Sequence, residues 1–476
     1  MQECGVSEVR AVPVHSTHDP VLRTWMKTQA PAMVAALSRL IQHPSYYRWD
    51  ESGAPFGAAI DACLDEAIAL ATEMGFRTYR DPEGYYGYVE MGTGPEQLAI
   101  LCHVDVVPAG DAADWFSAPY ALDERLGRLY GRGVQDNKGP LIAALYAMKA
   151  LQEGETPLRH TIRLILGTDE ESLWRCISRY KELEPLPDAA FTPDSAFPVI
   201  NAEKRLIQAY LYGPPSEELT LDCGELFNIV PDRAGYAGLK QKALQKQLDK
   251  LGYPWHEVQG KTVVLGQQAH ASRCDREGIN AIVRLTRALQ GIGYQHQALG
   301  FCSLVVGSDP HVRALLGDVS DEVSGKLTLN LASLKMDETA TQIGVDIRVP
   351  VTLPLADFQK MMRQAVNRLG WRYEEYDHLE PFYTPADSPL VSSLCKSYSQ
   401  VTGLSSQPIA SGGVTYARAL PNCIPFGARF PHQRSQAHMP NESVMLEDLL
   451  MAAEIYAHAL SHLQQFALRP NSGPQN

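Results

Sequence analysis

The sequence has few of the features that mark nucleic-acid-binding, membrane or secreted proteins. Its 476 residues carry a formal net charge of -13 and no block rich in lysine and arginine, which argues against nucleic acid and anionic membranes as partners. No apolar run is long enough to span a membrane. The N-terminus, residues 1–8, has early acids and no apolar signal-peptide core. We therefore expect a cytoplasmic protein with neither nucleic acid nor membrane as a partner.

The cysteines do not form a recognisable framework. There are 9, scattered along the chain, and no two are spaced as Cys-x-x-Cys. Disulfide-rich domains and thiolate zinc sites need paired spacings, so we expect reduced, mostly structural thiols. The sequence also lacks internal repeats, and its polar tail, residues 469–476, is predicted to be frayed.

What the chain does contain is an alternation of strand-like and helix-like segments. Nearly continuous apolar runs at 97–102 and 161–166 predict strands that are buried on both faces. Between them, residues 140–151 place apolar side chains on one helical face and begin with proline, which favours the first turn of a helix. Strand, helix and strand with short links are typical of an α/β sheet, in which ligand sites gather beyond the carboxyl ends of the strands.

The middle of the chain has a different texture. It combines alternating strands, such as 343–349, with a lysine- and glutamine-rich helix at 239–251, and so predicts a smaller α+β unit. The total length also exceeds what one hydrophobic core usually serves. We predict an α/β domain built from two segments, 1–203 and 383–476, with an inserted α+β domain at 204–382.

Three motifs place metal-ligating side chains at predicted strand ends or turns. His103 and Asp105 follow the first apolar strand, and because one residue separates them, both side chains point the same way. Asp136 lies between two glycines, which let the backbone bend and approach closely. Three consecutive acids, 169–171, follow the second strand, and like charges in a row are costly unless cations compensate them. An imidazole and several carboxylates in this arrangement suit a pair of divalent ions.

Each motif also has a simpler interpretation. His103 and Asp105 alone fit an ordinary surface loop, and Asp136 fits a helix N-cap. A run of acids is usually a solvated face, Asp194 fits a turn, and His438 is ambiguous in isolation. Only the combination of these residues favours metal binding.

Taken together, the motifs resemble those of the two-zinc exopeptidases, the superfamily that includes aminoacylase, carboxypeptidase G and succinyl-diaminopimelate desuccinylase. The resemblance rests first on three segments, 101–108, 131–140 and 167–172. Further segments are similar to those of bacterial dipeptidase V, one of the carnosinase-like Xaa-His dipeptidases: 191–194, 197–204, 415–418 and 437–442. The resemblance therefore spans nearly the whole chain.

The resemblance implies a three-layer α/β catalytic domain of the zinc-exopeptidase type, with the inserted domain as its α+β lid. It also implies two divalent metal ions, zinc first, with manganese or cobalt as alternatives. His103 and Asp194 would hold one ion, and Glu171 and His438 the other. Asp136 would bridge both ions.

The same resemblance implies roles for residues that are not metal ligands. Glu170 would be the general base that takes a proton from a water shared by the two ions, which leaves a bridging hydroxide, and Asp105 would orient the first histidine ligand. In the lid, His270 would polarise the scissile carbonyl, Arg348 would bind the substrate carboxylate and Asn228 would add a hydrogen bond. The backbone at Gly413, in the second catalytic segment, would line the same pocket. Without the family, the histidine is an ordinary loop residue and the arginine an ion-pair partner at a strand end.

Several residues depart from the family pattern without removing a ligand, namely Asn137, Leu173, Val414 and Met439. They leave the side-chain preference for substrate open. We predict a metallo-dipeptidase that acts on dipeptides or short peptides with a free C-terminal carboxylate, with an aminoacylase or a single-residue carboxypeptidase as alternatives. A non-catalytic peptide-binding relative is disfavoured because a binder needs no base such as Glu170. The length of the lid favours a monomer over a homodimer.

Overall fold

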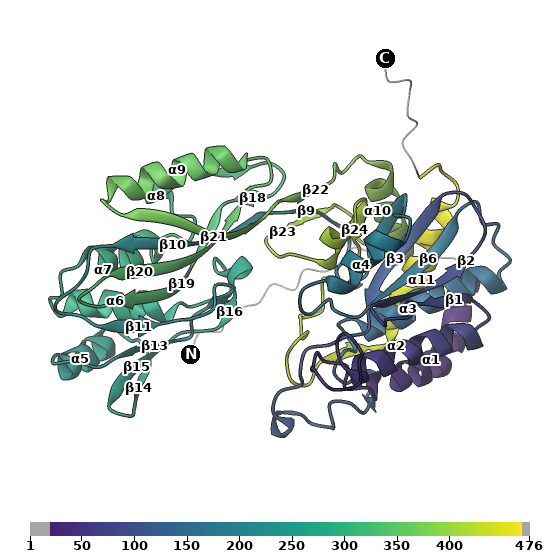
Figure 1. Ribbon diagram of the computed structural model, residues 1–476, viewed down its shortest axis with the longest axis horizontal. Coiled ribbons are helices and arrows are strands. Elements are labelled where there is room, and N and C mark those ends of the chain that lie inside the picture. Colours follow the sequence, from purple (N-terminus) through teal and green to yellow (C-terminus); the bar gives the residue numbers. More distant parts are fainter. Residues whose placement is uncertain (1–19, 469–476) are drawn as a thin grey trace, which may run out of the picture. The chain divides into compact units, whose positions relative to one another are not determined.

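The computed structural model describes residues 20–468, so the N-terminus and the polar tail discussed above lie outside the described chain. The chain forms two compact units (Figure 1). The first unit contains the described residues up to Asn201, together with Thr384–Ile409 and those from Thr415 onward. The second contains Ala202–Tyr383 and also Ala410–Val414, a short piece that the sequence places with the other domain.

A six-stranded mixed sheet forms the centre of the first unit. Four adjacent strands run parallel to one another, namely β6, β3, β7 and β24. The other two, β1 and β2, pair antiparallel at one edge of the sheet. In spatial order the strands are β1 (Arg77–Arg80), β2 (Tyr86–Met91), β6 (Thr161–Gly167), β3 (Gln97–His103), β7 (Ala189–Thr192) and β24 (Cys423–Pro425).

Helix α3 (Lys138–Glu153) is the central helix of this unit, because nearly all its side chains are buried. It packs against β3, and helices α1 and α11 pack against it (Figure 1). The other helices of the unit are α2, next to β1 and β2, α4, next to β2, and α10, next to α11. Their bounds are α1 (Pro20–Ile41), α2 (Ala58–Glu73), α4 (Arg175–Leu183), α10 (Pro389–Thr402) and α11 (Leu446–Leu463).

The parallel pairing of β3 and β6 determines where polar side chains gather. In β3, every residue from Leu98 to His103 is buried, as expected for a strand covered on both faces. Its register pairs His103 with Gly167, the last residue of β6. The carboxyl ends of the two strands therefore meet at one edge, and the acids that follow β6 begin beside His103.

The second unit is built on a five-stranded antiparallel sheet. Strand β10 shows the alternation expected of a half-buried sheet, with Ile207, Ala209 and Leu211 in the core of this unit. The sheet order is β11 (Leu221–Cys223), β19 (Thr328–Met336), β20 (Thr341–Val349), β10 (Arg205–Gly213) and β21 (Arg372–Leu379). Helices α6 (Ala281–Gly291) and α9 (Leu355–Arg368) contact this sheet, and α5 (Gln241–Leu251) contacts α6.

Shorter elements complete the described chain. A second antiparallel sheet of the second unit contains β13 (Arg233–Tyr236), β15 (Lys261–Leu265) and β14 (Trp255–Val258). The remaining short strands are β4 (Asp123–Arg125), β5 (Arg128–Tyr130), β8 (Ser195–Ala196), β9 (Ile200–Glu203), β12 (Ile229–Val230), β16 (Ala269–His270), β17 (Ser320–Asp321), β18 (Gly325–Lys326), β22 (Phe382–Tyr383), β23 (Ile409–Ser411), β25 (Ala428–Arg429) and β26 (Ser443–Met445); the short helices are α7 (Gln297–Gly300) and α8 (Arg313–Leu316). Between residues 20 and 468 no helix combines the length and apolar character needed to cross a bilayer.

Candidate metal centre

His103, the last residue of β3, has a fully buried imidazole whose proton position follows from its neighbours. Its Nδ1 lies 2.9 Å from the backbone carbonyl oxygen of Asp105 and 3.4 Å from that residue's carboxylate Oδ1. Because a carbonyl oxygen only accepts, Nδ1 carries the proton and Nε2 keeps a lone pair suited to a metal ion. The sequence predicts the carboxylate as the orienting group, but the nearer acceptor is the carbonyl of the same residue.

Asp136 lies between two histidines that are far apart in sequence. Its Oδ1 is 3.1 Å from Nε2 of His103, and its Oδ2 is 3.2 Å from Nε2 of His438. Each carboxylate oxygen therefore faces a different imidazole, and the carboxylate lies across the middle of the cluster.

The ligand-type side chains form two groups of three around this carboxylate. In each group the candidate ligand atoms all lie within 4.8 Å of one another. The first group is His103, Glu170 and Asp194, and the second is Asp136, Glu171 and His438. The structure thus brings together all five ligands that the resemblance implies, and it places Glu170 within the first group.

His438 comes from a loop in the C-terminal segment of the first unit. Its Nε2 lies 3.0 Å from a carboxylate oxygen of Glu171. The backbone of His438 has a φ of 66°, in the left-handed region that residues other than glycine rarely adopt. Such a conformation costs free energy and persists only where the surrounding structure enforces it, which is common at functional sites.

Burial and crowding of the acids shift their pKa values strongly. Burial, and then the charge of Asp194, raises the pKa of Glu170 well above its usual range. Burial, and then Asp136, raises the pKa of Glu171 to about 7. The pKa of His438 rises to about 11 because it hydrogen-bonds first Asp136 and then Glu171. Four half-buried carboxylates around one buried and one exposed imidazole are a local excess of negative charge, which divalent cations would neutralise.

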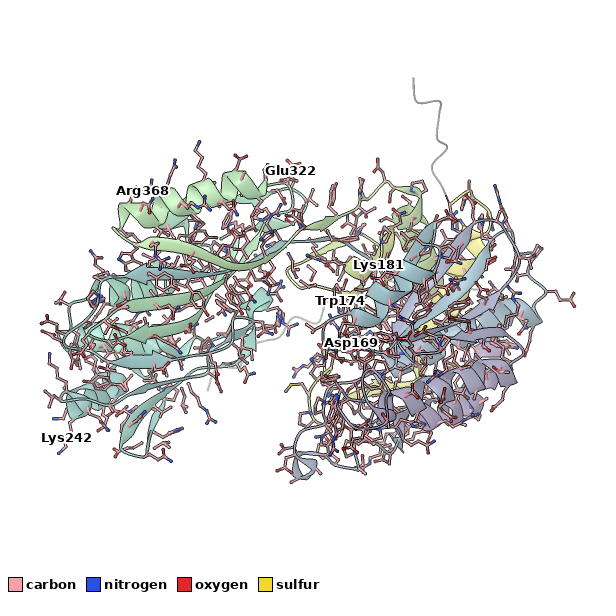
Figure 2. All side chains as sticks on the ribbon, viewed as in Figure 1. Asp169, Trp174, Lys181, Lys242, Glu322 and Arg368 are labelled. Atoms are coloured by element: carbon pink, nitrogen blue, oxygen red, sulfur yellow. The ribbon has the colours of Figure 1, made fainter. Side chains whose placement is uncertain are left out.

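The first of the three consecutive acids has a different partner. Asp169, which Figure 2 labels together with Trp174 and Lys181, is buried, and both its oxygens bind the guanidinium of Arg175, with distances of 2.7 and 2.8 Å. It also accepts the backbone N–H of Arg175 at the first residue of α4. Asp169 therefore holds the start of a helix, and only the two glutamates after it face the cluster.

Some residues that support the site were not predicted from the sequence. The amide of Asn137 donates to the carbonyl of Pro193 at 3.2 Å and approaches Asp194 at 3.5 Å, so it connects the loop of Asp136 to the turn of Asp194. The buried ring of Tyr416 stands edge-on to His103 with ring centroids 6.0 Å apart. Both residues lie inside the motifs that carry the resemblance, which is the only signal that could have identified them.

The residues that the resemblance assigns to substrate binding lie in the second unit. Two of them, His270 and Arg348, form hydrogen bonds with neighbouring residues of that unit. Nδ1 of His270 accepts the backbone N–H of Ser272 at 3.2 Å, so the proton of a neutral imidazole is on Nε2. The guanidinium of Arg348 forms a bidentate pair with Asp346 at 2.7 and 3.0 Å, and its Nη1 donates to the carbonyl of Gly412 at 2.7 Å. Two further candidates contribute less here.

Those two candidates are Asn228 and Gly413. The carbonyl of Asn228 accepts the backbone N–H of Ala271 at 2.8 Å, and Asn228 is exposed to solvent. The N–H of Gly413 donates to Oγ of Ser411 at 2.9 Å. The structure therefore fixes their backbones, while their roles toward a substrate stay predictions.

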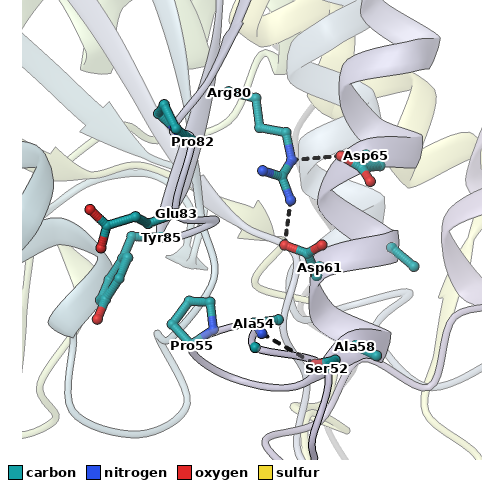
Figure 3. A pocket seen from close by; sticks show the side chains of 12 residues that line it. Ser52, Ala54, Pro55, Ala58, Asp61, Asp65, Arg80, Pro82, Glu83 and Tyr85 are labelled. Carbon is teal, nitrogen blue, oxygen red and sulfur yellow. Dashed lines mark hydrogen bonds and ion pairs between the residues drawn. The ribbon is translucent and has the colours of Figure 1, made fainter.

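A surface pocket of about 560 Å³ in the first unit shares no residue with the metal-type cluster. Figure 3 shows its arginine, Arg80, reaching between two acids. The guanidinium pairs with Asp65 at 2.6 Å and also with Asp61. Its lining includes no histidine or cysteine and its acids are partly neutralised, so it lacks the chemistry of the cluster.

Comparison with known proteins identifies the family. A model of peptidase family M20/M25/M40 matches residues 99–462. The "Putative dipeptidase YtjP" of Bacillus subtilis (strain 168) is 35% identical over 436 residues, which cover 86% of this chain and 92% of that protein. A "Putative dipeptidase" of Staphylococcus epidermidis is 31% identical over 431 residues, with 86% and 91% covered.

Solved structures show the same fold at low sequence identity. Human carnosine dipeptidase 1 has a TM-score of 0.57 at 15% identity, covering 94% of this chain and 98% of that one. The dipeptidase Dug1p from Saccharomyces cerevisiae has a TM-score of 0.56 at 14% identity, covering 95% and 100%. The chain belongs to peptidase family M20/M25/M40 and is a peptide hydrolase with that family's α/β fold, which confirms the predicted family and fold class.

Proposed function

We propose that this peptidase is a metal-dependent dipeptidase with a two-ion centre. The observation that carries the proposal is the position of Asp136, whose two oxygens face Nε2 of His103 and of His438 at 3.1 and 3.2 Å. A carboxylate in this position can bridge two cations. His103 and Asp194 would complete one ion's ligands, and Glu171 and His438 the other's. Nitrogen and oxygen donors of this kind suit zinc first, and also manganese or cobalt.

Two divalent ions, when bound, supply Lewis acidity that polarises a carbonyl and lowers the pKa of water. The chain's own contribution to proton transfer is Glu170. Its carboxylate is half-buried beside His103 and Asp194, and its raised pKa suits a group that takes up a proton and returns it to the leaving amine. Because the first ion already has three other candidate ligands, we assign Glu170 to proton transfer and not to metal binding.

The lid supplies substrate binding in this proposal. His270 has its proton on Nε2, the tautomer that can donate a hydrogen bond to the scissile carbonyl oxygen. Arg348 would bind the C-terminal carboxylate of the substrate with its planar fork. Asn228 and the turn at Gly413 would contribute further polar contacts. The relatives named as dipeptidases, which share about a third of their residues with this chain, support a substrate of two residues.

Metal analysis combined with a substrate panel tests the proposal. We expect the purified chain to hold two divalent ions, to cleave Ala-Ala, and to lose activity on treatment with a chelator. Faster hydrolysis of N-acetyl-Ala would identify an aminoacylase, and efficient release of one residue from a tripeptide would identify a carboxypeptidase. Hydrolysis of Ala-Ala by metal-free protein would contradict the proposal. Light scattering after size-exclusion chromatography tests the expected monomer.

A further inference from the structure

Two loops of the first unit meet at the second group of the metal centre and are joined by a buried carboxylate. One loop, 131–137, carries Asp136, and the other, 434–443, carries His438. The carboxylate of Glu442, in the second loop, is fully buried and accepts four hydrogen bonds from the first loop. Its donors are Nη1 of Arg132 at 2.7 Å and the backbone N–H groups of Gly133 at 3.1 Å, Gln135 at 2.7 Å and Asp136 at 3.1 Å.

The first loop holds the second in the same way. The half-buried side-chain amide of Gln135 uses both its oxygen and its nitrogen on the backbone of the loop that carries His438. Its Oε1 accepts the N–H groups of Gln436 at 2.7 Å and Ala437 at 3.1 Å, and its Nε2 donates to the carbonyls of Ser443 at 3.3 Å and Arg434 at 3.4 Å. We call Glu442 and Gln135 together the loop clasp.

The chemistry of the clasp is specific to these side chains. Glu442 uses both carboxylate oxygens as acceptors, since Oε2 takes Arg132 and Gly133, and Oε1 takes Gln135 and Asp136. A glutamine at position 442 has only one acceptor oxygen, so two of these donors would lose their partner in a dry environment. Neither member of the clasp belongs to the two groups of candidate ligands.

The clasp fixes the backbone on either side of one ion position. Glu442 binds the N–H of Asp136 itself, and Gln135 binds the N–H of Ala437, the residue before His438. Its contacts thus bear on two of the three side chains in the second group, Asp136 and His438. In the first group, His103 and Asp194 come from the ends of β3 and β7, away from both loops in sequence.

We propose that Glu442 and Gln135 are positioning residues that set the spacing between Asp136 and His438, and so determine the affinity for the ion held by the second group. The inference rests on the proposed two-ion centre. Residues that orient metal ligands from behind typically change metal affinity by about 10–100-fold when they are replaced. Here the effect should be larger for the ion of the second group, because the clasp contacts the loops of both Asp136 and His438, whereas it reaches the first ion only through Asp136.

Cobalt titration of the full chain tests this inference. The variants are Glu442→Gln and Gln135→Met, which keep the side-chain size, and the control is Glu447→Gln, an exposed glutamate at the start of α11 in the same segment. Co²⁺ binding is followed by its visible absorption and by competition with a chromophoric chelator. We expect wild type and control to bind two Co²⁺. Both clasp variants should bind the second ion about 10–100-fold more weakly and should lose clearly less affinity for the first.

A second measurement separates positioning from general loss of structure. In chelator-treated protein, hydrogen exchange of the peptide that covers 133–136 should be faster in Glu442→Gln than in the control, while the thermal unfolding of Gln135→Met stays close to that of wild type. Gln135→Met removes only a neutral amide and keeps the test valid if Glu442→Gln does not fold. The inference is overturned if the variants bind both ions as tightly as wild type does. It is also overturned if the affinity for both ions falls by the same factor. Failure of wild type to bind two ions instead overturns the proposed function.

Discussion

The carboxylate of Asp105 accepts a hydrogen bond from the backbone N–H of Glu171, with 2.9 Å between Oδ2 and the nitrogen. Asp105 follows β3 and Glu171 follows β6, two strands that pair in parallel, so this bond ties their ends together. Asp105 is almost completely buried, and its carbonyl also faces Nδ1 of His103. One residue therefore orients a candidate ligand in each of the two groups.

Replacing Asp105 should weaken metal binding without removing a ligand. In Asp105→Ala the backbone of Glu171 loses its acceptor, while the carbonyl that faces His103 is kept. We expect the affinity for divalent ions to fall by about 10–100-fold. Competition with a chromophoric chelator measures the change. An unchanged affinity would show that the strand ends hold Glu171 in place without this bond.

The two adjacent glutamates should separate proton transfer from metal binding. In Glu170→Gln we expect kcat to fall by about 10²–10⁴-fold while two ions per chain are retained, because the amide cannot take up a proton. In Glu171→Gln we expect metal to be lost first. Elemental analysis and steady-state kinetics of the same preparations measure both effects. Metal loss in the first variant and retention in the second would mean that the roles are reversed.

Removal of metal should destabilise the first unit. Four carboxylates lie close together there, and three of them have raised pKa values from burial and mutual charge. Metal at 100 times its dissociation constant should stabilise this unit by about 2.7 kcal/mol. Calorimetry with zinc and with a chelator should show a higher Tm for one transition in the presence of zinc. The shift should shrink in His438→Ala, and a shift of the same size there would place the stabilising ions elsewhere.

A buried lysine, Lys138, connects the loop of Asp136 to the C-terminal end of α1. Nζ of Lys138, which has no exposed surface, donates to the carbonyls of Leu40 and His43 at 2.9 Å each, at the C-terminal end of α1. Burial lowers the pKa of this amine, yet the helix end favours a positive charge. Lys138→Met should lower the free energy of unfolding by about 2–4 kcal/mol, because two charge-assisted hydrogen bonds are lost. Urea unfolding measures this, with Lys149→Met, at a half-buried position on the same helix, as a milder control.

The sequence predicts the strands that position the site more accurately than it predicts the helices. Strands β3 and β6 each extend one residue beyond the predicted 97–102 and 161–166, because their apolar runs are uninterrupted. Helix α3 spans Lys138–Glu153 and so extends two residues beyond the predicted 140–151 at each end. Helix α4 is short and has only three buried residues, namely Cys176, Ile177 and Tyr180, so its apolar face is small.

His103, Asp136 and Glu171 were accessible to sequence reasoning because each follows a predicted strand or lies in a glycine turn. Asp194 and His438 were assigned only through the resemblance to the family. The loop clasp was not accessible in either way, because its bonds join residues far apart in the chain. The bond from the N–H of Asp136 to Glu442 spans 306 positions. Local sequence carries no information about such a partner, since a buried glutamate looks the same in sequence as a solvated one. The partner is identified only in the folded structure, where the C-terminal segment contacts the loop of Asp136.

The role of Arg348 in substrate binding can be tested against a purely structural role. Arg348 is almost fully buried, and its fork is already paired with Asp346 and with the carbonyl of Gly412. If it also binds the substrate carboxylate, Arg348→Lys should lower kcat/KM for Ala-Ala by about 30-fold, equivalent to about 2 kcal/mol, because lysine lacks the planar fork. The same variant should have a much smaller effect on Ala-Ala amide, which has no carboxylate.

A matched control distinguishes this effect from damage to the sheet. Arg205→Lys changes another buried arginine, on β10 of the same sheet, that pairs with Glu380. It should leave the ratio of kcat/KM for the acid to that for the amide as in wild type, whereas Arg348→Lys should lower this ratio. If Arg348→Lys reduces hydrolysis of both substrates equally, then Arg348 acts only through Asp346 and Gly412, and another residue binds the carboxylate.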